Sequence, residues 1–323
     1  MTRSASEIIG SVRSDDPLAA HTPEVLWGTR ADRAHKTKEK PTARTTPWWS
    51  WCNLLSLDAP VISFVWALLF ARCYRASLSI PEAVVLFLSV WVIYVTDRLL
   101  DGWKIHHRSH LQERHLFCTR HRLPLAALAI CATAVSLCLT AKFFTPHEIF
   151  AGLNLALLVA LYMLAIHAGP ISLPRYLPKE LAVGLLFTAG TTLPLWSPNI
   201  GLPSQNWLSV ALFAALCSLN CLSIECWEFR SPPDSWRCMP HLVRWANSRI
   251  TLIAAALAIF ALLSIFVIPG TAASTPLLLA IALSALIILL LNRSRHHFSR
   301  LALRVLVDVA LAAAGSLALL IHT

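Results

Sequence analysis

The chain has 323 residues, of which 56% are hydrophobic and only 14% charged, with a mean hydropathy of +0.61 and a net charge of +10. A soluble domain carries about a quarter charged residues, so this composition leaves too much apolar surface for water. Ten glycines and long apolar stretches with few charges exclude collagen-like, coiled-coil, disulfide-framework and wholly disordered chains. The composition predicts an all-α protein that crosses a membrane several times.

The first 47 residues are polar, with eight basic and six acidic side chains and no apolar run long enough to span a membrane. They predict a disordered cytoplasmic tail. Trp48, Trp49 and Trp51 then mark a membrane interface, where indole rings prefer to lie. Residues 48–323 are expected to form one transmembrane domain. The nine cysteines include no Cys-x-x-Cys pair and are expected to be reduced packing residues.

Apolar stretches of span length recur along the rest of the chain. A helix needs about 20 residues to cross the hydrocarbon core, because it rises about 1.5 Å per residue. We predict nine spans, at residues 54–71, 81–100, 123–144, 149–168, 180–196, 205–227, 250–268, 275–291 and 301–321. The fifth is short enough for its ends to be irregular.

The basic residues predict the orientation of these spans. With the tail inside, 24 of the 27 Lys and Arg residues lie on the cytoplasmic side. The positive-inside rule therefore predicts a cytoplasmic N-terminus and an outer C-terminus. Topology and attraction to anionic lipid explain the basic excess without a nucleic-acid partner. We expect a multi-pass protein of the bacterial inner (cell) membrane.

Five acidic residues lie on the apolar stretches rather than in loops: Asp97, Asp101, Glu225, Glu228 and Asp308. An ionisable side chain at membrane depth costs about 2.5 to 3.5 kcal/mol on insertion scales, so it predicts a functional site facing the bundle interior. Asp97 and Asp101 are four residues apart and share one face of a helix. Mg²⁺ fits between such carboxylates, because it completes its coordination with water and substrate phosphate.

Glu225 and Glu228, three residues apart, share a face near the end of the sixth predicted span. The second and sixth spans run in the same direction, so both acidic pairs are expected near the cytoplasmic surface. We predict that the four carboxylates converge on one Mg²⁺ site. The alternative is that these acids only end their helices and pair with Arg98, Lys104 or Arg230.

The fifth acid, Asp308, follows Arg304 by four residues, the spacing of an ion pair within one helix. We predict a structural pair whose loss lowers stability. The loop 102–122 carries five Lys and Arg and five His residues. Most of these residues are explained by the positive-inside rule. A few basic side chains near Asp101 could bind phosphate oxygens. A zinc site is disfavoured, because His106 and His107 are adjacent and the other gaps are irregular.

Residues 54–321 resemble the UbiA-type intramembrane prenyltransferase superfamily. The likeness lies in nine spans with the N-terminus inside, an acidic DxxxD that ends the second span, and a basic loop after it. It extends to a Lys-Glu-Leu-x-x-Gly entry to the fifth span and an acidic motif that begins with Asn on the sixth. The residues that carry these motifs are Asp97, Asp101, Lys179, Glu180, Leu181, Gly184, Gly190 and Asn220.

The resemblance implies an all-helical bundle whose acidic motifs hold Mg²⁺ against an isoprenyl diphosphate. The isoprenyl tail would lie in a hydrophobic tunnel open to lipid, and the isoprenyl group would pass to an aromatic or lipid acceptor. The implied catalytic metal ligands are Asp97, Asp101, Glu225 and Glu228. The expected substrate-binding residues are Arg98, Lys104, Lys179, Asn220, Arg230 and, as an aromatic face for the carbocation, Tyr94.

The motifs also depart from the usual pattern of that family. Ile93 and Tyr94 stand where its first motif has Asn and Asp, and the second motif has Glu225 and Glu228 three apart instead of Asp residues four apart. Two other functions therefore stay open. One is an integral membrane terpene cyclase on the same scaffold. The other is a non-catalytic membrane protein that binds an isoprenoid or lipid diphosphate. A transporter is disfavoured, because the halves show no internal repeat.

Overall fold

The computed structural model describes residues 47–104, 113–168, 178–196, 207–228, 241–267 and 274–321. All of them lie in the unit Thr46–Thr323, the second of two units into which the chain divides. Of the predicted tail, only Pro47 belongs to the described residues. The regular elements in these ranges are all helices, as the composition predicts.

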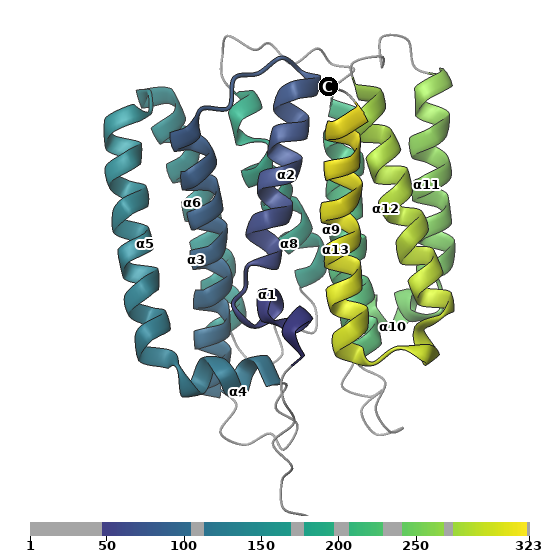
Figure 1. Ribbon diagram of the computed structural model, residues 1–323, viewed down its shortest axis with the longest axis horizontal. Helices are drawn as coiled ribbons and strands as arrows, with labels where there is room; N and C mark the ends of the chain where they lie inside the picture. The colour runs from purple at the N-terminus through teal and green to yellow at the C-terminus, as the bar shows by residue number, and fades with distance from the viewer. Residues whose placement is uncertain are drawn as a thin grey trace, which may run out of the picture. The chain divides into compact units, whose positions relative to one another are not determined.

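Figure 1 shows the helices and their labels. In chain order they are η1 (Trp48–Ser50), α1 (Trp51–Leu54), α2 (Asp58–Cys73), α3 (Ile80–Lys104), α4 (Glu113–Arg120), α5 (Arg122–Phe143), α6 (Pro146–His167), α8 (Lys179–Thr191), η2 (Leu193–Trp196), α9 (Trp207–Glu228), α10 (His241–Asn247), α11 (Ile250–Val267), α12 (Thr275–Arg293), η6 (Arg295–His297) and α13 (Arg300–Ile321).

Six of these helices are long and apolar enough to cross a membrane, namely α3, α5, α6, α9, α12 and α13. Two bent pairs, α1 with α2 and α10 with α11, turn by 80° at a short break and raise the number to eight if each pair is one span. Each of the nine predicted spans lies largely on one helix. The fifth, α8, has only 13 residues and a length of about 20 Å, which is short of the hydrocarbon thickness. The prediction of nine complete spans therefore remains a prediction.

Reciprocal side-chain caps fix where two of the spans begin. Before α6, the Thr145 backbone N–H donates to Glu148 Oε2 at 2.8 Å, and the Glu148 N–H donates to Thr145 Oγ1 at 3.4 Å. Before α3, Ser79 and Glu82 form the same pair of bonds at 2.6 and 3.4 Å. Each pair satisfies two backbone donors that the first helical turn leaves unpaired.

The buried core lies among α2, α9, α11, α12 and α13. At its centre the fully buried Trp66 stacks on Phe213 with ring centroids 4.5 Å apart, and its Nε1 donates to the Leu311 carbonyl at 3.1 Å. In contrast, α6 buries none of its residues, and large apolar side chains such as Leu153 and Leu164 are more than 60% exposed. An exposed apolar face of this kind requires lipid, so the protein is an integral, multi-pass membrane protein.

Three short helices lie where the sequence predicts only loop, interface or linker. These are α1, α4 and α10, at the end of the bundle where α3 ends and α13 begins (Figure 1). Trp51 of α1 contacts Phe117 of α4 edge-on, with ring centroids 6.2 Å apart. Helices this short are stable only when packed against a partner, which sequence periodicity does not show. We call this end of the bundle the α4 end.

Candidate functional site

The two acids of the DxxxD motif lie on one face of α3, as their spacing predicts. Both face His167, the last residue of α6. His167 Nε2 lies 3.0 Å from Asp97 Oδ1, and His167 Nδ1 lies 3.9 Å from Asp101 Oδ1. The side chains of Asp97 and Asp101 are 44% and 41% exposed, whereas that of His167 is 9% exposed. The pair is therefore accessible from outside, while the His167 ring contacts Asp97 on its inner side and lies near Asp101.

Sequence reasoning missed His167. The residue is the last but one of the fourth predicted span, and α6 ends at the same end of the bundle as α3 (Figure 1). One sequence feature could have identified it: His167 is an ionisable side chain at the end of an apolar span, on the same side of the membrane as Asp97 and Asp101. Its pairing with α3 is a contact between helices about 70 residues apart in the chain, which spacing alone does not predict.

The second acidic pair, on α9, is already neutralised by two basic side chains from other helices. Lys179 Nζ of α8 donates to Glu225 Oε1 at 2.9 Å, and Arg304 Nη1 of α13 donates to Glu228 Oε1 at 2.7 Å. The four side chains are between 19% and 34% exposed. Instead of facing one common ion, Glu225 and Glu228 reach toward different neighbouring helices.

Asp308 does not form the predicted pair with Arg304. Its Oδ1 accepts a hydrogen bond from Asn220 Nδ2 at 3.2 Å. Arg304 instead binds Glu228. The long arginine side chain crosses to α9, so the contact between helices replaces the one within the helix.

The Arg304–Glu228 pair is expected to contribute to stability. A double-mutant cycle of Arg304→Gln and Glu228→Gln should give a coupling of about 1 kcal/mol, since both groups are mostly buried and in direct contact. Thermal unfolding in detergent measures it. If the coupling between Arg304→Gln and Asp308→Asn were larger than that between Arg304→Gln and Glu228→Gln, Arg304 would pair with Asp308, as the sequence predicts.

Arg98 is 4% exposed and lies inside the bundle. Its Nη1 donates to the backbone carbonyls of Asn53 and Leu54, where α1 ends. These carbonyls lack helical partners, so Arg98 fixes α1 against α3. The predicted diphosphate contact of Arg98 is therefore not supported.

Two other predicted substrate-binding residues also face the interior. Asn220 is 8% exposed and holds Asp308. Tyr94 is half-buried and lies within electrostatic range of Asp58 and Asp308. The Lys104 side chain and Arg230 lie outside the described residues. Of the predicted substrate-binding residues, Lys179 is the one whose described position at the α4 end suits a phosphate group.

The Lys-Glu-Leu-x-x-Gly sequence fixes α8 against α9. Lys179 reaches Glu225 from the first residue of α8, and Glu180 beside it is 3% exposed. At Gly184 a Cβ atom would lie 2.2 Å from Ser218 Oγ and 2.6 Å from its backbone nitrogen. Glycine permits this close approach of two helices, and the approach brings Lys179 within reach of α9.

The carboxylates differ in how well they fit Mg²⁺. Within the described ranges, no group of three or more His, Cys, Asp or Glu side chains could hold a metal ion by itself. Mg²⁺ commonly takes one or two carboxylates together with water and substrate phosphates, and the exposed Asp97 and Asp101 fit that mode. Glu225 and Glu228 do not fit it as placed, because Lys179 and Arg304 already occupy an oxygen of each. Their role as metal ligands remains a prediction.

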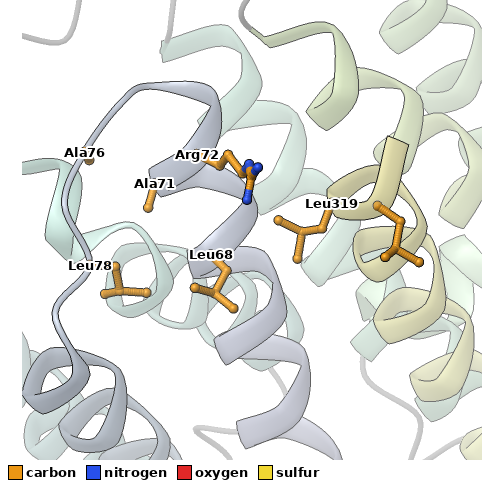
Figure 2. A pocket seen from close by; sticks show the side chains of 7 residues that line it. Leu68, Ala71, Arg72, Ala76, Leu78 and Leu319 are labelled. Carbon is orange, nitrogen blue, oxygen red and sulfur yellow. The ribbon is translucent and has the colours of Figure 1, made fainter. Parts of the chain in front are cut away.

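Two apolar grooves lie at the end of the bundle opposite the α4 end. The first, of about 490 Å³, lies between the end of α2 and the end of α13 (Figure 2). It is lined by Leu68, Ala71, Arg72, Ala76, Leu78, Leu319 and Leu320. The second, of about 460 Å³, shares Leu68 and Leu78 and continues along α3 past Val84, Phe87 and Leu88. Both linings are mostly apolar and neither contains a carboxylate that could hold Mg²⁺, so both grooves suit hydrocarbon.

No protein-family model and no curated protein matches the chain. Its structure is similar to the apo structure of a UbiA homolog from Aeropyrum pernix K1, with a TM-score of 0.53 and 15% sequence identity. The likeness covers 80% of this chain and 97% of that one. At this identity the match establishes architecture rather than activity, and it confirms the fold that the motifs predict. The chain therefore shares the fold of this UbiA homolog.

Proposed function

We propose that the protein transfers an isoprenyl group from an allylic diphosphate to an aromatic or lipid acceptor within the membrane, in a reaction that depends on Mg²⁺. The observation that carries this proposal is the pair Asp97 and Asp101. Both remain more than 40% exposed at the end of α3, in a fold shared with a UbiA homolog. We place the α4 end on the cytoplasmic side, because Arg120, Arg244 and Arg304 lie there.

In this proposal Asp97 and Asp101 hold Mg²⁺ together with the diphosphate. The metal supplies positive charge that stabilises the departing diphosphate. The His167 ring lies 3.0 Å from Asp97 Oδ1, so withdrawal of the ring frees this inner oxygen for a ligand. Lys179 carries further positive charge at the α4 end, and its ammonium has two donors beyond the one that binds Glu225.

The chemistry of the proposed step is a substitution at the allylic carbon. The carbon–oxygen bond to the diphosphate breaks and the diphosphate leaves with the electron pair. The acceptor forms a bond to the same carbon and loses a proton. Apolar surroundings exclude water, which would otherwise capture the cation. We place the isoprenyl tail along α3, from Asp97 toward the groove at Leu88, a distance of about 14 Å along the helix.

A second function is favoured by the ion pairs of α9. Since Glu225 and Glu228 are each paired with a basic residue, one carboxylate pair is left for the metal. A protein with a single such pair would bind an isoprenoid diphosphate without ionising it.

Purified protein in lipid vesicles, given Mg²⁺, a hydrophobic acceptor extract and isoprenyl diphosphates of several lengths, tests the proposal. We expect Mg²⁺-dependent release of diphosphate and an isoprenylated acceptor detected by mass spectrometry. Release with a cyclised hydrocarbon as product would favour a terpene cyclase. Mg²⁺-dependent binding without release would favour the non-catalytic function, and absence of both binding and release would refute the proposal.

A further inference from the structure

The end of α2 carries two arginines on the side of the membrane that basic residues otherwise avoid. Of the 27 Lys and Arg residues, 24 are predicted on the cytoplasmic side, and the other three are Arg72, Arg75 and Lys142. Lys142 lies over the ring of Phe143, 5.3 Å from its centroid. Arg72 and Arg75 are exposed, and neither pairs with a carboxylate within the described part of the chain. Topology therefore does not explain these two charges.

The chain leaves α2 through a turn that favours glycine at position 75. The Ala76 N–H donates to the Ala71 carbonyl at 2.8 Å, and the Arg75 N–H donates to the Arg72 carbonyl at 3.4 Å. These bonds form a Schellman motif, in which Arg75 takes the left-handed position with a φ of 54°. A residue with a Cβ atom is disfavoured there. The backbone therefore does not explain the arginine, whereas the motif brings both arginines to one turn.

An apolar groove begins beside this turn. Among the seven described residues that line the groove between α2 and α13, Arg72 is the charged one, and its side chain points from α2 toward Leu319 (Figure 2). Leu68 and Leu78 line both this groove and the second one, which follows α3. The volumes, about 490 and 460 Å³, lie in the range of ligand sites, about 300 to 1,000 Å³. A cation beside two adjoining apolar grooves fits a ligand with an anionic head and two hydrocarbon chains.

We propose that Arg72 and Arg75 bind the headgroup phosphate of an anionic phospholipid in the leaflet opposite the α4 end, with one acyl chain in each groove. Guanidinium groups bind phosphate oxygens through paired N–H donors. Leu68 and Leu78 then lie between the two chains, and the lipid contacts α2, α3 and α13 together. The site lies at the other end of the bundle from the DxxxD pair, so it is separate from the proposed isoprenyl transfer.

Two simpler explanations predict different results. A neutral phospholipid fills the grooves by apolar contact alone, and it leaves the arginines without a ligand of net negative charge. Arg72 also lies in the last turn of α2, where a basic side chain stabilises the helix end through its dipole. That effect needs no lipid. The charge of the lipid and the dependence on added lipid therefore separate the three explanations.

The test is thermal unfolding of the purified chain in a non-ionic detergent, titrated with dioleoyl phosphatidylglycerol or with dioleoyl phosphatidylcholine. The chains of the two lipids are identical, but the choline ammonium cancels the charge of its phosphate. A ligand that binds the folded state raises Tm by mass action. We expect phosphatidylglycerol to raise the Tm of the wild type by about 2 °C more than phosphatidylcholine does. Arg72→Gln should weaken the apparent affinity for phosphatidylglycerol about fivefold.

Two further variants test the turn and the groove. Arg75→Gly should raise Tm without lipid, because glycine suits the left-handed position, and should weaken the response to phosphatidylglycerol. Ala76→Leu places a larger side chain in the groove at a position of the Schellman motif that accepts apolar residues. It should weaken the response to both lipids. These two variants decide the matter if Arg72→Gln does not fold.

Arg120→Gln is the matched control, because it removes an exposed arginine at the α4 end and should keep the wild-type response. An equal loss in Arg120→Gln and Arg72→Gln would overturn the proposal in favour of general attraction between basic residues and anionic lipid. Equal responses of the wild type to both lipids would also overturn it, in favour of a neutral occupant. So would a lower Tm of Arg72→Gln without lipid together with an unchanged lipid response, which is the result expected from the helix dipole. None of these measurements involves isoprenyl diphosphate.

Discussion

Replacing Asp97 or Asp101 with Asn is expected to weaken Mg²⁺-dependent binding of isoprenyl diphosphate by about 100-fold or more while the bundle stays folded. The amide keeps the shape of the side chain but removes the charge that a divalent cation requires. Both side chains are more than 40% exposed and contribute little packing. Binding of a radiolabelled isoprenyl diphosphate to purified protein, with Mg²⁺ and with chelator, measures the effect.

Glu148→Gln is the matched control for this experiment. Glu148 lies at the opposite end of α6 from His167, and Gln retains the oxygen that accepts from the Thr145 N–H. Its binding should equal that of the wild type. Glu225→Gln should lower stability through loss of the Lys179 pair with a smaller effect on binding. If Glu225→Gln abolished Mg²⁺-dependent binding and Asp97→Asn did not, the metal site would belong to α9 instead of α3.

The long helices could be predicted from the sequence because each carries its own signal. A span such as 205–227 is apolar over the length that lipid requires, and the structure places α9 at Trp207–Glu228. The end of α8 was not predictable in the same way. Residues 181–196 are continuously apolar apart from three threonines, but the helix ends at Thr191 and a 3₁₀ turn follows. Hydropathy shows that a segment is apolar, and it does not show where the helical backbone ends.

The candidate site was predictable only to the extent that it is local. The spacing of Asp97 and Asp101 fixes a shared face, because helical geometry needs no partner. Which group each acid meets depends on which helices are neighbours. His167 meets α3 from α6, and Arg304 meets Glu228 across α13 and α9. The spacing of Arg304 and Asp308 permits an ion pair, but a carboxylate on a neighbouring helix competes for the same guanidinium.

These pairings suggest that the two acidic motifs have different roles, one in helix packing and the other in ligand binding. The α9 acids are mostly buried and each has a strong basic partner, which makes them elements of the α8–α9–α13 packing. The α3 acids are more exposed, and Asp97 contacts the imidazole of His167, a weaker and more easily displaced partner than an ammonium or a guanidinium. An exchangeable partner is what a site for substrate and metal needs.

The close approach of α8 and α9 leads to the other large expected effect. Gly184→Ala should destabilise the protein by about 1 to 3 kcal/mol. The new Cβ would lie 2.2 Å from Ser218 Oγ, and rotation of that hydroxyl would not relieve the contacts of 2.6 and 2.8 Å with the Ser218 nitrogen and Cα. The two helices must therefore separate. Since Lys179 lies on the same helix, the separation should also weaken its pair with Glu225.

Gly152→Ala distinguishes this packing effect from the general effect of alanine on a helix. Gly152 also lies in a helix, and a Cβ there would meet nothing within 4 Å. Alanine should therefore stabilise α6 by up to about 1 kcal/mol. Thermal unfolding of both variants should move Tm in opposite directions. If Gly184→Ala were as stable as Gly152→Ala, the contact between α8 and α9 would be loose. Lys179 would then reach Glu225 through side-chain length rather than through helix packing.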